Sequence, residues 1–288
     1  MFTPQSKTIR CSDKILDLNQ PRIMGILNVT PDSFYDGGRY TEFSAALRHA
    51  EQMLADGADI IDIGAYSSRP NARDVSEQEE IDRLAPFISQ LSAGFPDCII
   101  SVDTFRSNVA REAIRLGAHI INDVSGGGLD EQMYAVAGQL QVPYILMHMR
   151  GTPATMQSFT TYEDLIGDIS QYFAERIALL RTHGVRDIIL DPGPGFSKTL
   201  NQNYELVNRF RELTVFGLPL LGAVSRKSMV YKALDSGPAE ALNGTTILNA
   251  ALVRNGANLL RVHDVKEARE VIQLSIKLNE SNLIYENN

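Results

Sequence analysis

The stretch at residues 23–38, IMGILNVTPDSFYDGG, begins as an apolar strand and turns polar at Asn28. Pro31 and the paired glycines Gly37 and Gly38 prevent the strand from continuing and predict a loop. This loop brings an amide, a carboxylate and two aromatic rings directly after a buried strand, which favours substrate binding over simple connection. The alternative is a polar turn with two solvated rings. It is the weaker interpretation, because an apolar strand with a polar end recurs along the chain.

The recurrence predicts the fold. The apolar runs are residues 23–27, 60–63, 99–102, 120–124, 144–147, 188–190, 218–224 and 259–262, and helical spacing is found at 43–54, 109–116, 172–180, 247–253 and 265–276. Strands that alternate with helices in this way predict an α/β fold, a closed parallel (β/α)8 or TIM barrel. We expect a short N-terminal hairpin or lead-in at 1–21, the barrel at 22–279 and a frayed polar tail at 280–288.

The residues that precede the strands alternate in kind. Pro21, Pro96, Pro143 and Pro219 precede the odd strands, and Gly57, Gly117, Gly184 and Gly256 precede the even ones. Glycine adopts the left-handed conformation that ends many helices without a steric penalty from Cβ, so each of these glycines is expected in that conformation. The chain therefore divides into βαβα units, a grouping that carries no information about function.

Composition limits the classes of partner. The 288 residues carry a formal net charge of −8, with a pI of about 5.2, and no run of lysines or arginines. Such a surface disfavours nucleic acid and anionic membranes as partners. Cys11 and Cys98 are far apart in sequence, which favours a reducing compartment. No stretch has the composition of a signal peptide or a membrane helix, so we expect a cytoplasmic protein.

Polar groups follow the predicted strands, at the end where barrel enzymes carry their catalytic residues. Arg69, Arg261 and His263 are cationic or potentially so, and arginine's planar fork suits phosphate oxygens. We expect these side chains to form a phosphate or pyrophosphate cradle. A lone His148 after the fifth strand is more often structural.

A second group follows other strands and consists of Asp103, Asn122, Asp191 and Lys227. The carboxylates and the amide would accept from ring N–H and NH2 donors, and the ammonium would donate to a ring oxygen. This combination predicts a pocket for a flat, guanidine-like heterocycle. The alternative is a buried ion pair between Lys227 and Asp191, which would contribute little net stability.

These motifs together resemble the dihydropteroate synthase family of pterin-binding barrels. The matching segments are MGILNVTPDSF, DIGAYSSRP, SVDT, INDVSGG, LMHMRGTPATMQ, ILDPGPGF, SRKS and RVHDV, in family order over residues 23–265. The resemblance implies that 6-hydroxymethyl-7,8-dihydropterin pyrophosphate is joined to 4-aminobenzoate, and that 7,8-dihydropteroate and pyrophosphate are released. It also implies Mg²⁺, a homodimer formed through outer helices, and sulfonamides as mimics of the amine.

The resemblance also assigns site residues. Asn28 falls at the Mg²⁺–pyrophosphate position. The residues assigned to pyrophosphate are Asn28, Ser68, Arg69, Arg261 and His263. Those assigned to the pterin are Asp103, Asn122, Met147, Asp191, Lys227 and Arg261, and those assigned to aminobenzoate are Pro31, Phe34, Phe196 and Ser228. The residues assigned to catalysis are Asn28, Asp103, Lys227, Arg261 and His263. Departures from the family pattern occur at Ala65-Tyr66, Asn71 and Pro194.

The implied reaction is displacement of pyrophosphate from the exocyclic carbon of the pterin by the aniline nitrogen. The loops at 30–40 and 67–76 would close over the site, so that the pyrophosphate substrate binds first and the amine second. Competing hypotheses are a methyltetrahydrofolate-dependent corrinoid methyltransferase, a non-catalytic pterin-binding barrel, and an aldolase that uses Lys227 as a Schiff base. The first has no use for the TPDSF loop, for Lys227 in SRKS or for the pyrophosphate cations. The second predicts erosion at Asn28, Lys227 or His263 that the chain does not show.

Overall fold

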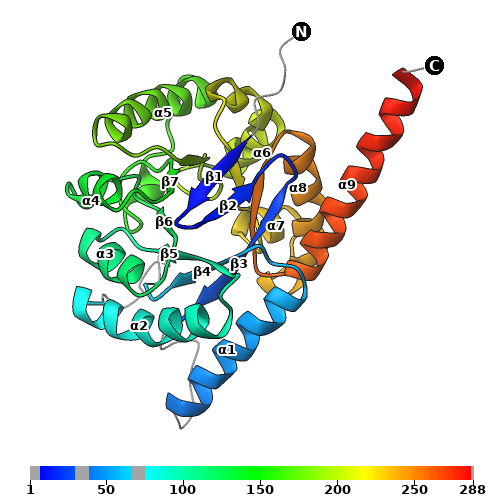
Figure 1. Ribbon diagram of the computed structural model, residues 1–288. Coiled ribbons are helices and arrows are strands. Elements are labelled where there is room, and N and C mark those ends of the chain that lie inside the picture. The colour runs from blue at the N-terminus through cyan, green and yellow to red at the C-terminus, as the bar shows by residue number, and fades with distance from the viewer. Residues whose placement is uncertain (1–6, 30–38, 67–74, 287–288) are drawn as a thin grey trace.

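The computed structural model describes residues 7–29, 39–66 and 75–286. Parallel strands form a central barrel, helices surround it, and a two-stranded antiparallel hairpin lies across one end (Figure 1). The hairpin consists of β1 (Thr8–Cys11) and β2 (Lys14–Asp17). The barrel strands are β3 (Arg22–Asn28), β4 (Ile60–Gly64), β5 (Ile99–Asp103), β6 (Ile120–Asp123), β7 (Tyr144–Met147), β8 (Ile188–Asp191), β9 (Leu221–Gly222) and β10 (Leu259–Val262).

The sheet closes on itself. Its eight strands are hydrogen-bonded in the order β8-β7-β6-β5-β4-β3-β10-β9, and a parallel bridge between Leu190 and Leu220 joins β8 to β9. Leu190 N donates to the carbonyl oxygen of Pro219 at 2.9 Å across this seam. The predicted parallel barrel and the N-terminal hairpin are therefore confirmed. Seven of the strands end within one residue of the predicted runs, whereas β9 is much shorter than the run at 218–224.

A helix follows each barrel strand. The helices are α1 (Arg39–Ala55), α2 (Glu77–Gly94), α3 (Ser107–Arg115), α4 (Met133–Leu140), α5 (Leu165–Thr182), α6 (Leu200–Arg209), α7 (Ser228–Ala233), α8 (Leu242–Arg254) and α9 (Val265–Glu286), with 3-10 turns η2 (Met156–Ser158), η3 (Phe210–Phe216) and η4 (Pro238–Glu240). The sequence analysis did not identify α2, α4, α6 and α7. α9 continues to Glu286, so residues 280–286, expected as a polar tail, belong to this helix.

Helix boundaries follow local chemistry. Ser76 caps α2 by accepting from Glu79 N at 3.2 Å, and acidic residues in the first turn complement the helix dipole. Thr199 and Gln202 form a capping box at the start of α6. The four glycines before even strands have positive φ angles of 101°, 112°, 85° and 98° at Gly57, Gly117, Gly184 and Gly256, as predicted.

One part of the core lies inside the barrel. The interior residues are Met24, Ile60, Ile99, Ile120, Ile145, Ile189, Leu221, Ala223 and Leu259, and they pack against Ile9, Cys11, Leu16 and Leu18 of the N-terminal segment. The hairpin therefore seals the N-terminal end of the barrel with apolar side chains. Lys14 Nζ donates to the Cys98 carbonyl at 2.9 Å, and Asn258 Nδ2 donates to the Leu18 carbonyl at 3.0 Å, which fixes the hairpin to the loops before β5 and β10.

Cys11 and Cys98 are both buried and free. Burial raises the pKa of the Cys11 thiol to about 12 and that of Cys98 to about 11. Within the described ranges, none of the helices combines the length and the apolar character that crossing a bilayer requires.

Candidate active site

The barrel interior is apolar near the N-terminal ends of the strands and mostly polar in the next layer of inward side chains. Alternate side chains of a strand point to the same side, so the residue two positions beyond an inward isoleucine also points inward. Most of those residues are polar, namely Asp62, Ser101, Asn122, Asp191 and Arg261, two positions after Ile60, Ile99, Ile120, Ile189 and Leu259; Ile26 and Met147, two positions after Met24 and Ile145, are the apolar members of this layer. The polar layer lies toward the carboxyl ends of the strands, where barrel enzymes carry their active sites.

Arg261 reaches from β10 to the acidic side chains of two other strands. Its Nε donates to Asp62 Oδ2 at 2.6 Å, and its Nη2 donates to Asp103 Oδ2 at 2.6 Å. The sequence analysis assigned Arg261 to both the pterin and the pyrophosphate groups, and the structure places it beside the pterin acid Asp103. It missed Asp62, which is fully buried on β4. The alternation of β4 could have identified it, because Asp62 shares the inward parity of Ile60.

Asp62 and Asp103 lie around the buried guanidinium of Arg261, and this environment affects the protonation of Asp103. Burial raises the pKa of Asp103 to about 7, although Arg261 opposes the shift, and Asp62 adds to it. The Asp103 side chain is 21% exposed, so one edge of this carboxyl group is reached from the pocket. Asp103 therefore changes charge close to neutral pH.

Three acceptor oxygens at this end of the barrel are not used by the described residues. Asp103 and Asp191 each use one carboxylate oxygen inside the protein, with Arg261 and with Gly193 N respectively, and Asn122 uses its Nδ2 on Asp62. The remaining oxygens accept no hydrogen bond from the described residues. Within the described ranges, the enclosed side-chain atoms without a hydrogen-bond partner are Asp62 Oδ1, Ser101 Oγ and Asn249 Oδ1. None of the three oxygens is among these enclosed atoms. These oxygens are therefore accessible acceptors.

Lys227 supplies a donor near these oxygens, since the charges of Asp191 and Asp103 act on it. Its Nζ donates to the Pro194 carbonyl at 2.6 Å and lies 4.8 Å from the centre of the Phe196 ring. Burial lowers the pKa of Lys227 to about 8, against the opposing charge of Asp191. Among the described residues no ion pair joins Lys227 to Asp191, so the alternative of a closed buried pair is not what the structure contains. Pro194, a departure from the family pattern, contributes only its backbone oxygen here.

The loop after β8 depends on glycine at Gly193. Its φ is +66°, and a Cβ there would lie 2.2 Å from the His148 carbonyl oxygen, which no larger residue tolerates. This close approach lets Asp191 Oδ1 accept from Gly193 N at 2.8 Å. The backbone thus fixes one oxygen of Asp191 and leaves the other for a ligand.

A buried lysine that the sequence analysis missed supports the same loop. Lys198 is 3% exposed, and its Nζ donates to the carbonyls of Gly193 and Phe196, both at 3.0 Å, and contacts His148 Nδ1 at 3.1 Å. Burial lowers the pKa of Lys198 to about 7, and burial together with the Lys198 charge lowers the pKa of His148 well below its usual value. His148 is thus structural, as its isolation in the sequence indicated.

Apolar side chains line the same region. Met147, Met149 and Met156 form a small buried cluster, and Phe196 and Val124 pack against it. Met147, predicted to lie on the face of the pterin, is 2% exposed at the end of β7. A flat ring held by the polar edge would meet this surface.

His263 follows β10 and is held by Ser225. Its backbone N donates to Ser225 Oγ at 3.1 Å, and its Nδ1 lies 3.0 Å from the same oxygen. Desolvation by neighbouring atoms and the nearby charge of Arg261 lower the pKa of His263 to about 4, although the residue is exposed to solvent. This shift favours the neutral ring, whereas the sequence placed His263 among side chains that are cationic or potentially so.

The remaining predicted residues fall into two sets. Asn28 is the last residue of β3 and Ser228 the first of α7, and both are exposed. The predicted residues Pro31, Phe34, Ser68 and Arg69, and the departure at Asn71, lie outside the described residues. At the other departure, the Tyr66 ring meets Phe105 edge-on at a centroid distance of 5.0 Å.

No protein-built metal cage is present in the described part of the chain, where no group of three or more His, Cys, Asp or Glu side chains is arranged to hold an ion. Asn28 offers an exposed amide that makes no side-chain hydrogen bond to the described residues. Such a single oxygen ligand fits Mg²⁺, which keeps several waters and takes other ligands from substrate phosphates.

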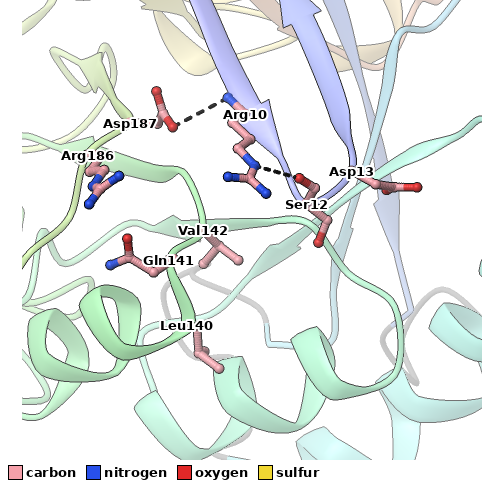
Figure 2. Close-up of a pocket in the computed structure, with 8 residues that line it drawn as sticks. All are labelled: Arg10, Ser12, Asp13, Leu140, Gln141, Val142, Arg186 and Asp187. Carbon is pink, nitrogen blue, oxygen red and sulfur yellow. Dashed lines mark hydrogen bonds between the residues drawn. The ribbon is translucent and has the colours of Figure 1, made fainter.

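A separate surface pocket of about 590 Å³ lies at the opposite, N-terminal end of the barrel (Figure 2). It lies between the hairpin and the loops before β7 and β8, and Arg10 N donates to Asp187 Oδ2 at 3.4 Å across it. The charges of Asp13 and Asp187 balance those of Arg10 and Arg186. None of the predicted site residues contributes to this pocket, so the candidate active site is the polar layer at the other end.

A closed (β/α)8 barrel with polar, acceptor-rich side chains at the carboxyl ends of its strands has the features of a barrel enzyme. A family model described as pterin binding enzyme matches residues 24–263. The chain belongs to this family and, within it, to the dihydropteroate synthases.

Named relatives support the assignment. The dihydropteroate synthase of Escherichia coli K12 is 43% identical over 261 residues, covering 90% of this chain and 92% of the relative. That of Synechocystis is 45% identical over 256 residues, covering 88% of each chain. The Yersinia pestis dihydropteroate synthase, solved as a sulfonamide drug complex, superposes with a TM-score of 0.89 at 41% identity and covers 95% of this chain and 99% of its own. The Xanthomonas albilineans enzyme with 4-aminobenzoic acid gives a TM-score of 0.89 at 34% identity, with 96% and 99% covered.

Proposed function

We propose that the chain joins 6-hydroxymethyl-7,8-dihydropterin pyrophosphate to 4-aminobenzoate, giving 7,8-dihydropteroate and pyrophosphate in folate biosynthesis. One observation carries the proposal: Asp103, Asn122 and Asp191 each keep an oxygen that no described residue uses, and the Lys227 ammonium lies close enough for the charges of Asp191 and Asp103 to act on it. The names of the relatives and the 4-aminobenzoic acid complex of the Xanthomonas enzyme support it.

Ring recognition follows from the donor and acceptor pattern. A pterin presents ring N–H and exocyclic NH2 donors along one edge and a carbonyl oxygen beside them. The open oxygens of Asp103, Asn122 and Asp191 would accept from the donors, and Lys227 would donate to the carbonyl. Met147 and Phe196 would cover the apolar surface of the ring. A ring without these donors would leave buried acceptors unpaired, which disfavours its binding.

The leaving group would lie farther toward the mouth. Asn28, Ser68, Arg69 and His263 are proposed to hold the pyrophosphate, on the family pattern. His263 needs no positive charge for this role. Ser225 Oγ already accepts from the backbone N of His263, so its hydrogen can donate to Nδ1 and leave Nε2–H free to donate to a phosphate oxygen. Asn28 would hold Mg²⁺, which when bound would supply positive charge that favours departure of the pyrophosphate.

The chemical step is a displacement at the exocyclic carbon of the pterin. The C–O bond to pyrophosphate breaks and its electron pair leaves with the oxygen, while the lone pair of the aniline nitrogen forms the C–N bond. The nitrogen then loses one proton to solvent. Asp103 in its ionised form would stabilise positive charge that develops on the pterin. Phe196 and Ser228, with Pro31 and Phe34 from the first loop, would hold the amine.

Pyrophosphate release tests the proposal. The purified chain is mixed with the pterin pyrophosphate, 4-aminobenzoate and Mg²⁺, and released pyrophosphate and dihydropteroate are measured together. Equal amounts of both products are expected, with neither formed when the amine is omitted. Methyl transfer to a corrinoid, or no turnover with tight pterin binding, would instead support the methyltransferase or the non-catalytic alternative.

We also propose a homodimer in the cytoplasm. Ile247 on α8 and Leu274 and Leu278 on α9 are 60%, 67% and 67% exposed, and the two helices lie side by side on the outside of the barrel (Figure 1). Exposed apolar side chains on neighbouring helices favour association. Changing Leu274 and Leu278 to glutamate should give a monomer in sedimentation equilibrium; an unchanged mass would refute this interface.

The Yersinia complex supports a further proposal, inhibition by sulfonamides.

A further inference from the structure

Asp62 is buried at the centre of the polar layer, and the proposed reaction assigns it no part. Its side chain is 0% exposed on β4. Its Oδ2 accepts from Arg261 Nε at 2.6 Å and from Asn122 Nδ2 at 3.0 Å, while its Oδ1 is enclosed and has no partner among the described residues. One carboxylate oxygen therefore holds two residues of the pocket.

Stability alone does not account for this arrangement. An enclosed carboxylate costs free energy when one of its oxygens is unpaired, and a well-packed apolar residue is often at least as stable. Ser101 pairs in register with Asp62 on the next strand, and its Oγ is also enclosed without a partner. The two strands thus carry two unpaired polar atoms at adjacent positions below the pocket, which indicates a requirement other than stability.

The requirement lies in the orientation of Asn122. An amide side chain has an acceptor end and a donor end, and its neighbours decide which end points where. Because a carboxylate only accepts, Asp62 holds the NH2 end of Asn122 against the barrel wall. The oxygen of Asn122 then faces the pocket, where it accepts no hydrogen bond from the described residues.

We propose that Asp62 is a positioning residue that sets the pocket's specificity for a ring edge made of donors. It does so by holding Asn122 with its oxygen toward the ligand and by holding Arg261 against Asp103. The inference rests on the proposed function, since the donor-rich ring it selects is the pterin. With Asn122 reversed, an NH2 group would face the ring donors and one of three acceptors would be lost.

An exchange of the two side chains tests the proposal. In Asp62→Asn, the new amide can donate to Asn122 and allow it to turn, so the affinity for pterin, measured by calorimetry with 2-amino-4-oxopteridine, should fall by roughly tenfold or more. In the double variant Asp62→Asn with Asn122→Asp, residue 62 donates to a carboxylate whose other oxygen faces the pocket. This variant should bind pterin within about threefold of wild type, because an open acceptor is restored.

Asp59→Asn is the matched control. Asp59 precedes the same strand and pairs with Arg22 and Arg269 outside the barrel interior, so its loss should lower the melting temperature and leave pterin affinity unchanged. A double variant that binds pterin no better than Asp62→Asn, or an Asp62→Asn variant that binds like wild type, would overturn the proposal. Pyrophosphate release by the wild type is measured in parallel. Its absence with normal pterin binding would count against the proposed function and not against the role of Asp62.

Discussion

Replacing Lys227 with methionine should make the protein more stable and less active. The Lys227 ammonium is partly buried, forms no ion pair with the described residues, and donates a hydrogen bond to one backbone carbonyl. Burial lowers its pKa from 10.5 to about 8. Because folding lowers the pKa of Lys227, its charged form is disfavoured in the folded state. This cost to the free energy of unfolding is fully present below pH 8 and disappears as the pH rises past the pKa of the unfolded state.

The size of the effect follows from this pKa. The difference from 10.5 corresponds to a cost of roughly 3 kcal/mol at pH 7, which would appear as a rise of roughly 5 °C in the melting temperature of Lys227→Met. The same variant loses one charge-assisted hydrogen bond to the ring oxygen of the pterin. Such a bond contributes roughly 2–3 kcal/mol, so pterin affinity should fall by roughly 30- to 150-fold.

Two measurements on one sample check the reasoning. Thermal unfolding at pH 7 gives the stability, and calorimetric titration with a pterin gives the affinity per folded molecule. Lys232→Met is the matched control, because Lys232 is exposed on α7 and should change neither quantity. A Lys227→Met protein that is less stable than wild type and binds pterin normally would show that Lys227 is structural, and the proposed pocket would be wrong.

Three further outcomes are expected. Asp191→Asn should weaken pterin binding by roughly 2–5 kcal/mol in calorimetry, since an amide would turn a donor toward the ring; a loss below about 1 kcal/mol would remove Asp191 from the site. Pterin affinity should peak between pH 7 and 8, because Asp103 becomes a neutral acid below a pKa of about 7 and Lys227 loses its charge above about 8; a flat profile from pH 6 to 9 would contradict this. 4-Aminobenzoate should bind more tightly after Mg²⁺-pyrophosphate and a pterin than to the free protein, and equal affinities would refute ordered binding.

The sequence predicted the barrel because each strand is a compact apolar run with a polar end. It did not predict α2, whose apolar positions are interrupted by Pro86 and by a strongly acidic first turn, although Ser76 followed by Glu79 is a recognisable capping signal. The short β9 was overestimated for a different reason. An apolar run shows that a segment is buried, but the hydrogen bonds that end a strand depend on its neighbours.

The candidate site was predicted in part. Asp103 and Asn122 are linked through Arg261 and Asp62, and the charges of Asp191 and Asp103 act on Lys227, so these residues lie near one another, while their role in binding stays a prediction. The lowered pKa of His263 could not be predicted, because it comes from desolvation by neighbouring atoms and from the charge of Arg261, which only the folded chain brings near.

Lys198 and Asp62 were missed for related reasons. A lysine in a loop usually indicates a solvated side chain, and only the tight turn at Gly193 brings carbonyl oxygens around its ammonium. Asp62 stands inside the apolar run of β4, where a single acid carries no sign of its partners 60 and 199 residues away.

The hairpin across the floor of the barrel has a consequence for how the chain folds. Its residues are synthesised before the barrel strands, yet Leu18 accepts a hydrogen bond from Asn258, and β3 pairs in register with β10, from Arg22 with Leu259 to Gly25 with Val262. These contacts of very long sequence separation close late, because the loop between them must be ordered first. The nascent chain therefore holds an unclosed sheet edge until its last strand is made, and removal of either the first 18 residues or the last strand should expose the same apolar floor to aggregation.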